Sequence, residues 1–170
     1  MAYKNKTYVA FDGDNDIKSY YLMKAWKENK HIDFDFYDAH ELNSARDTST
    51  EESIKAQLRE RMKNAKQMIL LVGENTKYLR KFVPWEIDFA RKNNIPIIVV
   101  NLNNKRGYDD GLCPSSIKDN VYTISVSFNA AIIKYALDDF PEDYQNNKDK
   151  ESCKSHRFSY KDSVYEKLGL

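Results

Sequence analysis

The sequence predicts an α/β domain, a three-layer sandwich with a central five-stranded parallel sheet. The main observation is the stretch 68–100, which begins with the apolar run MILLV and ends with IPIIVV, with a polar turn and one helical segment between them. Two short apolar runs on either side of a helix indicate a βαβ unit with buried parallel strands. The length of 170 residues is enough for one such domain with a real core, and too little for two.

The first strand is predicted at residues 7–11, TYVAF, and it runs into the polar turn DGDND. Gly13 lets the chain turn, and Asp12, Asp14 and Asp16 are side chains that can cap a helix starting at about Ile17. Two interpretations of DGDND stay open: a polar rim beside a binding crevice, or ordinary turn and cap chemistry.

The second strand is predicted at residues 34–37, with Asp38 at its end. The following residues, 39–50, are polar and typical of a loop, and Thr50 precedes a helix that carries Ile54, Leu58 and Met62 on one face. The other face of this helix is basic, and we interpret it as solvated surface rather than a nucleic-acid groove.

The turn GENTKYLRKF, residues 73–82, follows the third strand, at the edge of a parallel sheet where ligands collect. Pro84 is then predicted to start a helix, which places Glu86 in its first turn. A first-turn carboxylate can be purely structural, since the helix dipole favours it by about 0.3–1 kcal/mol. The residues alone therefore leave a structural and a catalytic role for Glu86 open.

The rest of the chain supplies the last two strands and a tail. Residues 95–100 and 121–127 are the fourth and fifth strands, separated by a long polar loop with at most one short helical turn. A helix is expected at about 129–140, ended or kinked by Pro141. The tail regains apolar residues after 157, enough to pack back on the domain.

Composition excludes several classes of function. The chain has 27 basic and 26 acidic residues and a net charge of +1, so there is no basic field for nucleic acid. The start of the chain shows no signal-peptide pattern and no apolar run approaches the length of a membrane span, so a cytoplasmic location without membrane contact is the expectation. The spacing of two cysteines and three histidines suggests neither disulfides nor a metal site.

Two segments together resemble the TIR domain family. The order of strand, GENT, basic-aromatic turn and FVPWEI resembles the third strand and following helix of TIR domains, and YVAFDGDND resembles the opening box of the family. By this match Phe82, Val83 and Glu86 take the aromatic, aliphatic and catalytic positions, while Ala10 stands where serine is frequent. The resemblance covers about residues 6–103 and implies a flavodoxin-like, TIR-like fold.

The longer layout is similar to a TIR-like branch of bacterial anti-phage defence, including Thoeris-type systems. On that basis we expect a TIR-like domain at residues 1–147 and an extension at 148–170 that packs on the same domain. Members of the family cleave NAD to nicotinamide and an ADP-ribose product, which is linear, cyclised or joined to an acceptor. Such a product would be a second messenger for an effector, and TIR enzymes often need other TIR copies to act.

The expected site follows from the same resemblance. Glu86 is expected to be the catalytic carboxylate, and the substrate-binding residues are expected to be Phe11, Asp12, Asp14, Asp38 and Phe82. One carboxylate can suffice because nicotinamide leaves from a cationic ring and needs no proton, unlike the leaving group of an ordinary glycoside. Since the sequence has neither GxGxxG nor GxxxxGK[ST], NAD would be a substrate and no cofactor is expected.

Three other functions share parts of this pattern. A non-catalytic TIR-like module that binds nucleotide or other TIR domains would share the fold, and a deoxyribosyltransferase-like enzyme would use a glutamate on the same anomeric carbon. A phosphoacceptor receiver is disfavoured because the third strand ends in VGEN without an acceptor aspartate and the fifth ends in SVS without a lysine.

Overall fold

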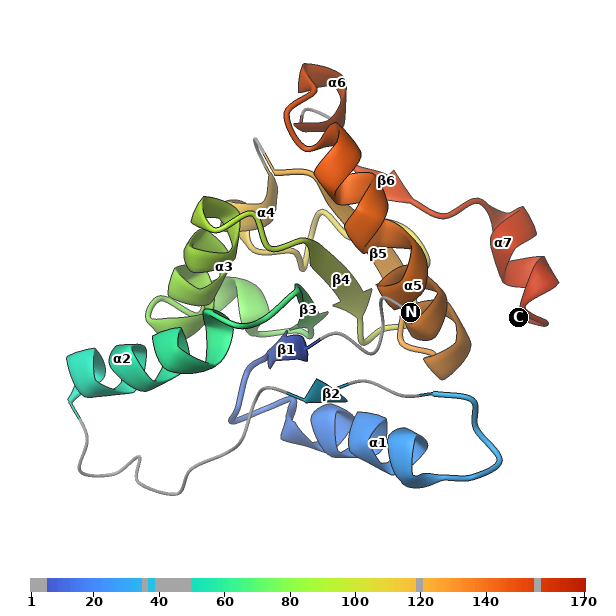
Figure 1. Ribbon diagram of the computed structural model, residues 1–170. Helices are drawn as coiled ribbons and strands as arrows, with labels where there is room; N and C mark the ends of the chain where they lie inside the picture. The colour runs from blue at the N-terminus through green and yellow to red at the C-terminus, as the bar shows by residue number, and fades with distance from the viewer. Residues whose placement is uncertain (1–5, 35–36, 39–49, 119–120, 155–156) are drawn as a thin grey trace.

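The computed structural model describes residues 6–34, 37–38, 50–118, 121–154 and 157–170, and for Lys6, Tyr37 and Asp38 it describes the backbone. All the strands of its sheet run parallel, in the order β2-β1-β3-β4-β5-β6 (Figure 1). The strands are β1 (Lys6–Ala10), β2 (Tyr37–Asp38), β3 (Gln67–Val72), β4 (Ile97–Asn101), β5 (Thr123–Ser127) and β6 (Phe158–Ser159). The fold class and the parallel arrangement of the five predicted strands are confirmed. The second strand, predicted at 34–37, is described only as β2 at Tyr37–Asp38, and β6 adds a short sixth strand.

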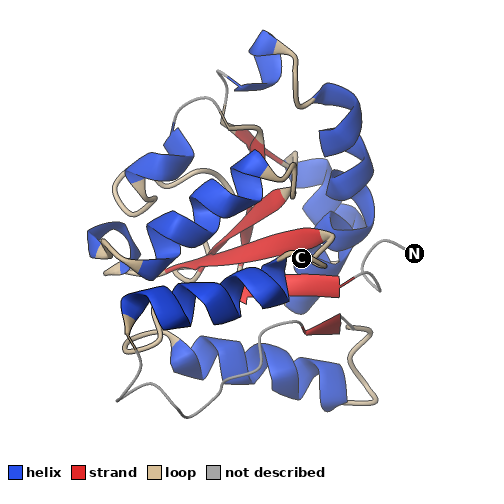
Figure 2. Ribbon diagram, turned by 60° about the vertical axis from the view of Figure 1, so that its left-hand side comes forward, coloured by secondary structure: helices blue, strands red, loops and turns tan. Residues whose placement is uncertain are grey.

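Helices cover both faces of this sheet, as Figure 2 shows. They are α1 (Ile17–Glu28), α2 (Glu51–Met62), the 3₁₀ turn η2 (Thr76–Tyr78), α3 (Phe82–Lys92), α4 (Ser115–Lys118), α5 (Ala130–Asn147), α6 (Glu151–Lys154) and α7 (Asp162–Lys167). Two of the predicted helix starts are confirmed, because α1 begins at Ile17, and Thr50 caps α2 by accepting the Ser53 N–H at 3.2 Å.

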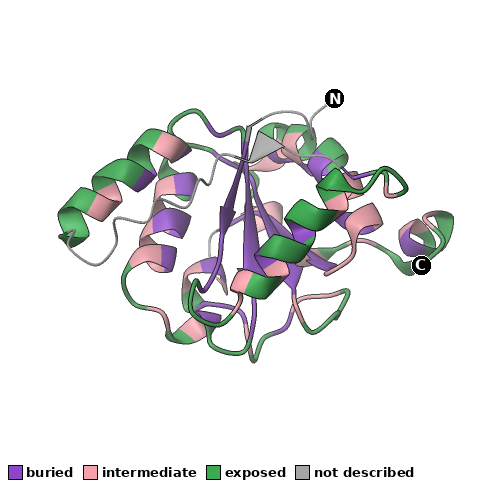
Figure 3. Ribbon diagram, turned by 90° about the horizontal axis from the view of Figure 1, so that it is seen from below, coloured by how far each residue is buried: buried purple, intermediate pink, exposed green. Residues whose placement is uncertain are grey.

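The core is split by the sheet into two layers, and alternate strand residues point into each. Val9 and Ile69 pack with α1, α5 and α7 on one face, whereas Tyr8 and Met68 pack with α2, α3 and α4 on the other. Figure 3 shows the buried strands edge-on between the two layers of helices. Because both faces are covered, β3, β4 and β5 are buried along their whole length, which explains the near-continuous apolar sequence of β3 and β4, whereas β5 (TISVS) alternates polar and apolar residues.

The structure corrects the start of one predicted helix and the end of another, both predicted at prolines. The helix predicted to start at Pro84 begins at Phe82, so Pro84 is its third residue. For the second helix the alternatives were an end or a kink at Pro141: the end is wrong, because α5 continues to Asn147 with Pro141 inside it, and the kink stays a prediction. The apolar spacing explains this continuation, because Leu137, Phe140 and Tyr144 are all buried on one side of α5, and that packing outweighs the hydrogen bond that proline removes.

The end of the chain contacts the far edge of the sheet. β6 pairs with β5 through Ile124 and Phe158, and Tyr165 of α7 is completely buried. The division of the chain into residues 1–147 and 148–170 stays a prediction.

Candidate functional site

A cavity of about 360 Å³ opens where β1 and β3 end, at their carboxyl edge. These two strands are neighbours in the sheet although α1, β2 and α2 separate them in sequence, so the chain direction along the sheet reverses between them. In open α/β sheets such a reversal leaves a crevice in which ligands bind. The lining residues come from the turn after β1, from α2 and from the segment that enters α3: Phe11, Asp12, Gly13, Asp14, Ile54, Leu58, Leu79, Arg80, Lys81, Phe82, Val83 and Glu86.

Glu86 lies on the cavity wall and is only 5% exposed. It is the fifth residue of α3, and the first turn of α3 contains no acid, so the predicted first-turn position is wrong. Stabilisation by free N–H groups of the first turn, the structural role considered for Glu86, therefore loses its basis. Phe82 and Val83, four and three residues earlier, share its helix face, which explains why all three line the same cavity.

The surroundings of Glu86 are mostly apolar. Leu58, Val83 and Ile87 are buried near it in one cluster, with Phe82 and Leu79 packed against that cluster. Placing a carboxylate in such a setting costs desolvation energy, and proteins concentrate this arrangement at functional sites.

The turn after β1 forms the opposite wall. The Asp12 carboxylate is 2% exposed and accepts hydrogen bonds from the backbone N–H groups of Asp14 (3.1 Å) and Asn15 (3.4 Å) and from the Asn15 side chain (2.7 Å). It therefore holds the turn together as well as lining the cavity, so both interpretations of DGDND apply. Asp14 is exposed at the rim, and the Phe11 ring stacks on Tyr20 with centroids 4.8 Å apart.

Asp16 joins this turn to the one after β3. Its side chain does not cap α1 as expected, and a Cβ added to Gly73 would lie 2.5 Å from its Oδ2. Burial, and next the charge of Asp12, raise the pKa of the Asp16 carboxyl, while a hydrogen bond with Thr76 acts in the opposite direction. Thr76 Oγ1 also accepts the Gly73 N–H at 2.9 Å. The absence of a side chain at Gly73 thus leaves room for the Asp16 carboxylate in its present position.

Two cations on the cavity rim were not among the predicted site residues. Arg80 and Lys81 lie in the turn between η2 and α3, and both are exposed. Arg80 Nη1 donates to the carbonyls of Lys77 at 2.8 Å and Leu79 at 3.3 Å, which folds the guanidinium onto its own turn. The sequence signal was present in the basic turn KYLRKF, but nothing in the sequence distinguished these cations from ordinary surface charges.

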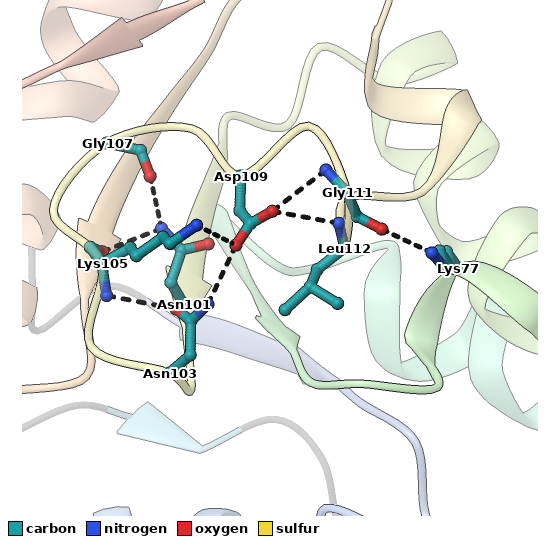
Figure 4. Close-up of polar contacts among 8 residues, drawn as sticks. All are labelled: Lys77, Asn101, Asn103, Lys105, Gly107, Asp109, Gly111 and Leu112. Atoms are coloured by element: carbon teal, nitrogen blue, oxygen red, sulfur yellow. Dashed lines mark hydrogen bonds and ion pairs between the residues drawn. The ribbon is translucent and has the colours of Figure 1, made fainter.

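The loop after β4 supports this turn from the side, as Figure 4 shows. Lys77 Nζ donates to the Gly111 carbonyl at 2.6 Å, and Asp109 accepts the N–H groups of Gly111 (3.0 Å) and Leu112 (3.2 Å). Contacts from Lys105 and then Asn103 hold the pKa of the Asp109 carboxyl below its usual value. The sequence predicts this segment only as a polar loop, and the structure adds the hydrogen bonds that hold it in place.

Five of the six residues predicted from the resemblance line the same cavity: Phe11, Asp12, Asp14, Phe82 and Glu86. The sixth, Asp38, pairs in β2 with Thr7 of β1, and its side chain lies outside the described residues. The loop 39–49, expected to contact ligand or neighbouring copies, also lies outside them.

Two further observations concern the described ranges alone. Within them, no three histidine, cysteine, aspartate or glutamate side chains are grouped in a way that could hold a metal ion. No helix in the same ranges combines the length and the apolar character that crossing a membrane requires.

Comparison with known proteins gives two results. Among solved structures, the chain is similar to a conserved protein from Enterococcus faecalis, with 18% identity and a TM-score of 0.44 over 63% of this chain and 69% of that chain. The family described as Thoeris protein ThsB, TIR-like domain, matches residues 8–107, a span that includes every residue of the cavity. The chain therefore belongs to the family of Thoeris ThsB proteins with a TIR-like domain.

Proposed function

We propose that this protein cleaves the bond between nicotinamide and ribose in NAD, with Glu86 as its catalytic carboxylate. The observation that carries the proposal is the place of Glu86, a buried acid on the wall of a ligand-sized cavity at the carboxyl edge of β1 and β3. Membership of the Thoeris family suggests a role in anti-phage defence.

The protein contributes to this reaction mainly by electrostatic stabilisation of the transition state. The bond between C1′ and the ring nitrogen breaks, and its electron pair goes to nicotinamide, which leaves as a neutral molecule. The ribose is left as an oxocarbenium ion, and water adds to C1′ and releases a proton to give ADP-ribose. The Glu86 carboxylate stabilises the positive charge on the ribose and accepts hydrogen bonds from the ribose hydroxyls.

The apolar wall of the cavity supports the same chemistry. Ile54, Leu58 and Phe82 reduce the access of water to the reacting carbon, and a charge interaction is stronger in such surroundings than in water. If another nucleophile, such as the adenine of the same molecule, replaces water, the product is cyclic. We propose that this ADP-ribose product is a messenger for an effector and that copies of the chain assemble for activity.

The test is turnover of NAD by the purified chain at high concentration, with the products identified by mass. Glu86→Gln should keep the fold and lower the rate at least about 100-fold, the effect of removing one group that stabilises transition-state charge. Asp88→Asn is the matched control, because Asp88 lies two residues further along α3 and forms an exposed ion pair with Lys92 at 2.7 Å. A folded protein that binds NAD without turnover would instead be a non-catalytic TIR-like module.

A further inference from the structure

The charges around the cavity are separated by sign. The acids, Asp12, Asp14 and Glu86, come from the turn after β1 and from the second turn of α3. The bases, Arg80 and Lys81, both lie on the rim just before α3 begins. A ligand in this cavity therefore meets negative groups along the walls and positive groups at one side of the mouth.

We infer that Arg80 and Lys81 bind the diphosphate of the substrate and so orient it with the nicotinamide ribose inside. This inference rests on the proposed function and assigns the charged parts of NAD to places in the cavity. NAD carries a positive charge on its nicotinamide ring and negative charges on its two phosphates, with a ribose between them. The separation of charges in the cavity matches that order in one direction only.

Glu86 and Lys81 reach the same cavity from different places along α3. Glu86 follows Lys81 by five residues, which corresponds to about 7.5 Å along a helix axis. A carboxylate at C1′ and a cation at the phosphate next to C5′ must be separated by the length of a sugar, which is several ångströms. Because both residues line the same cavity, one bound nucleotide can contact Glu86 at its ribose and Lys81 at its phosphate.

Two features prepare the rim for an anion. Arg80 is held by its bonds to the carbonyls of Lys77 and Leu79, and because both use Nη1, the donors on Nη2 and Nε can serve a phosphate. Lys81 is the N-cap residue of α3, so the backbone N–H groups of Phe82 and Val83 lie beside it at the positive end of the helix dipole.

The cavity volume sets how much of the substrate is enclosed. About 360 Å³ is near the lower end of ligand pockets, which range from about 300 to 1,000 Å³. That volume suits nicotinamide, ribose and the adjoining phosphate, with the adenosine half outside the mouth. Recognition should then depend strongly on the phosphates and weakly on the adenine.

The experiment compares three substrates with no, one and two phosphates: nicotinamide riboside, nicotinamide mononucleotide and NAD. Arg80→Gln and Lys81→Gln, singly and together, are measured beside Arg91→Gln, which removes a cation at the other end of α3. The double variant should raise KM for both phosphorylated substrates about tenfold or more, the effect of losing a charged hydrogen bond, with kcat nearly unchanged. The rate of nicotinamide riboside cleavage should stay as in the wild type. Arg80→Lys should raise KM for the phosphorylated substrates less than Arg80→Gln does.

Equal loss on all three substrates would show that Arg80 only supports its turn, and an unchanged KM for NAD would also overturn the inference. NAD binding to a Glu86→Gln protein, measured by calorimetry, separates this inference from the proposed function. Suppose that the wild type does not turn NAD over, but that adding Arg80→Gln to the Glu86→Gln protein still weakens NAD binding about tenfold. The diphosphate site then stands and the catalytic proposal fails. If NAD does not bind, or binds equally well without Arg80 and Lys81, the diphosphate site is wrong.

Discussion

Replacing Tyr165 tests whether the end of the chain is part of the folded domain. Its side chain is completely buried, its ring lies 4.3 Å from the Arg106 guanidinium carbon, and its hydroxyl accepts the Ser127 N–H at 3.2 Å. Ser127 is the last residue of β5, so the contact ties α7 to the same edge of the sheet at which the cavity opens.

Tyr165→Ala removes a buried aromatic ring, and we expect a loss of about 3–5 kcal/mol in the free energy of unfolding. Tyr165→Phe removes only the hydroxyl and should lose about 0.5–1.5 kcal/mol. For a chain of this length each kcal/mol lowers Tm by about 2–4 °C, so the alanine variant should melt roughly 6–20 °C below the wild type.

The assay is thermal unfolding followed by circular dichroism. Tyr21→Ala is the control, because Tyr21 is 53% exposed and its loss should change the free energy of unfolding by no more than about 0.5 kcal/mol. If Tyr165→Ala melts with the wild type, the ring does not contribute to the core and residues 148–170 do not pack as described.

The remaining predictions concern the turns beside the cavity. Asp16→Asn should raise Tm near pH 7. The pKa of Asp16 is raised, so its protonated form stabilises the fold below about pH 3.8, and this contribution is lost as the pH rises. Thermal melting at pH 7.5 and at pH 3.5 checks that the gain in Tm over the wild type disappears in acid. Gly73→Ala should be destabilising because its Cβ would meet the Asp16 carboxylate, and a double-mutant cycle with Asp16→Ala should recover part of the loss; independent effects would contradict the contact. Asp109→Ala should lower the free energy of unfolding at pH 7 by about 1–3 kcal/mol, since two backbone N–H groups lose their acceptor. Because the pKa of Asp109 is lowered, its contribution to the free energy of unfolding is present above its ordinary pKa and should vanish as the pH falls. Urea unfolding of the wild type and of Asp109→Ala at falling pH measures this contribution. A difference between the two proteins that stays constant with pH would contradict the role of the carboxylate.

Much of the fold was predictable because burial leaves a simple pattern. The runs in β3 and β4 are apolar at every position but the first or last because both faces of these strands are covered, and in an α/β chain a short continuous apolar run is typical of a buried parallel strand. β6 was missed because it has only two residues and its pairing with β5 depends on where the tail returns. The local rule by which proline ends a helix fails at Pro141 because it ignores the packing of α5 on the sheet.

The residues that line the cavity were predictable in part. Glu86, Phe82 and the acids after β1 were found through the resemblance to the TIR family, and they line one cavity because β1 and β3 are neighbours in the sheet. Arg80 was not found, since an exposed cation in a turn has no periodic pattern and only the fold places it on the rim. The contact of Asp16 with Gly73 joins two turns distant in sequence, so local rules gave Asp16 a capping role instead.

Release of nicotinamide is the most direct test of a catalytic role for the buried glutamate of α3. The wild-type chain, concentrated enough for copies to assemble, should convert NAD to nicotinamide and an ADP-ribose product. The Glu86→Gln chain, with an unchanged circular dichroism spectrum, should release nicotinamide at least about 100-fold more slowly. Equal rates of release from the two proteins would contradict the catalytic assignment of Glu86.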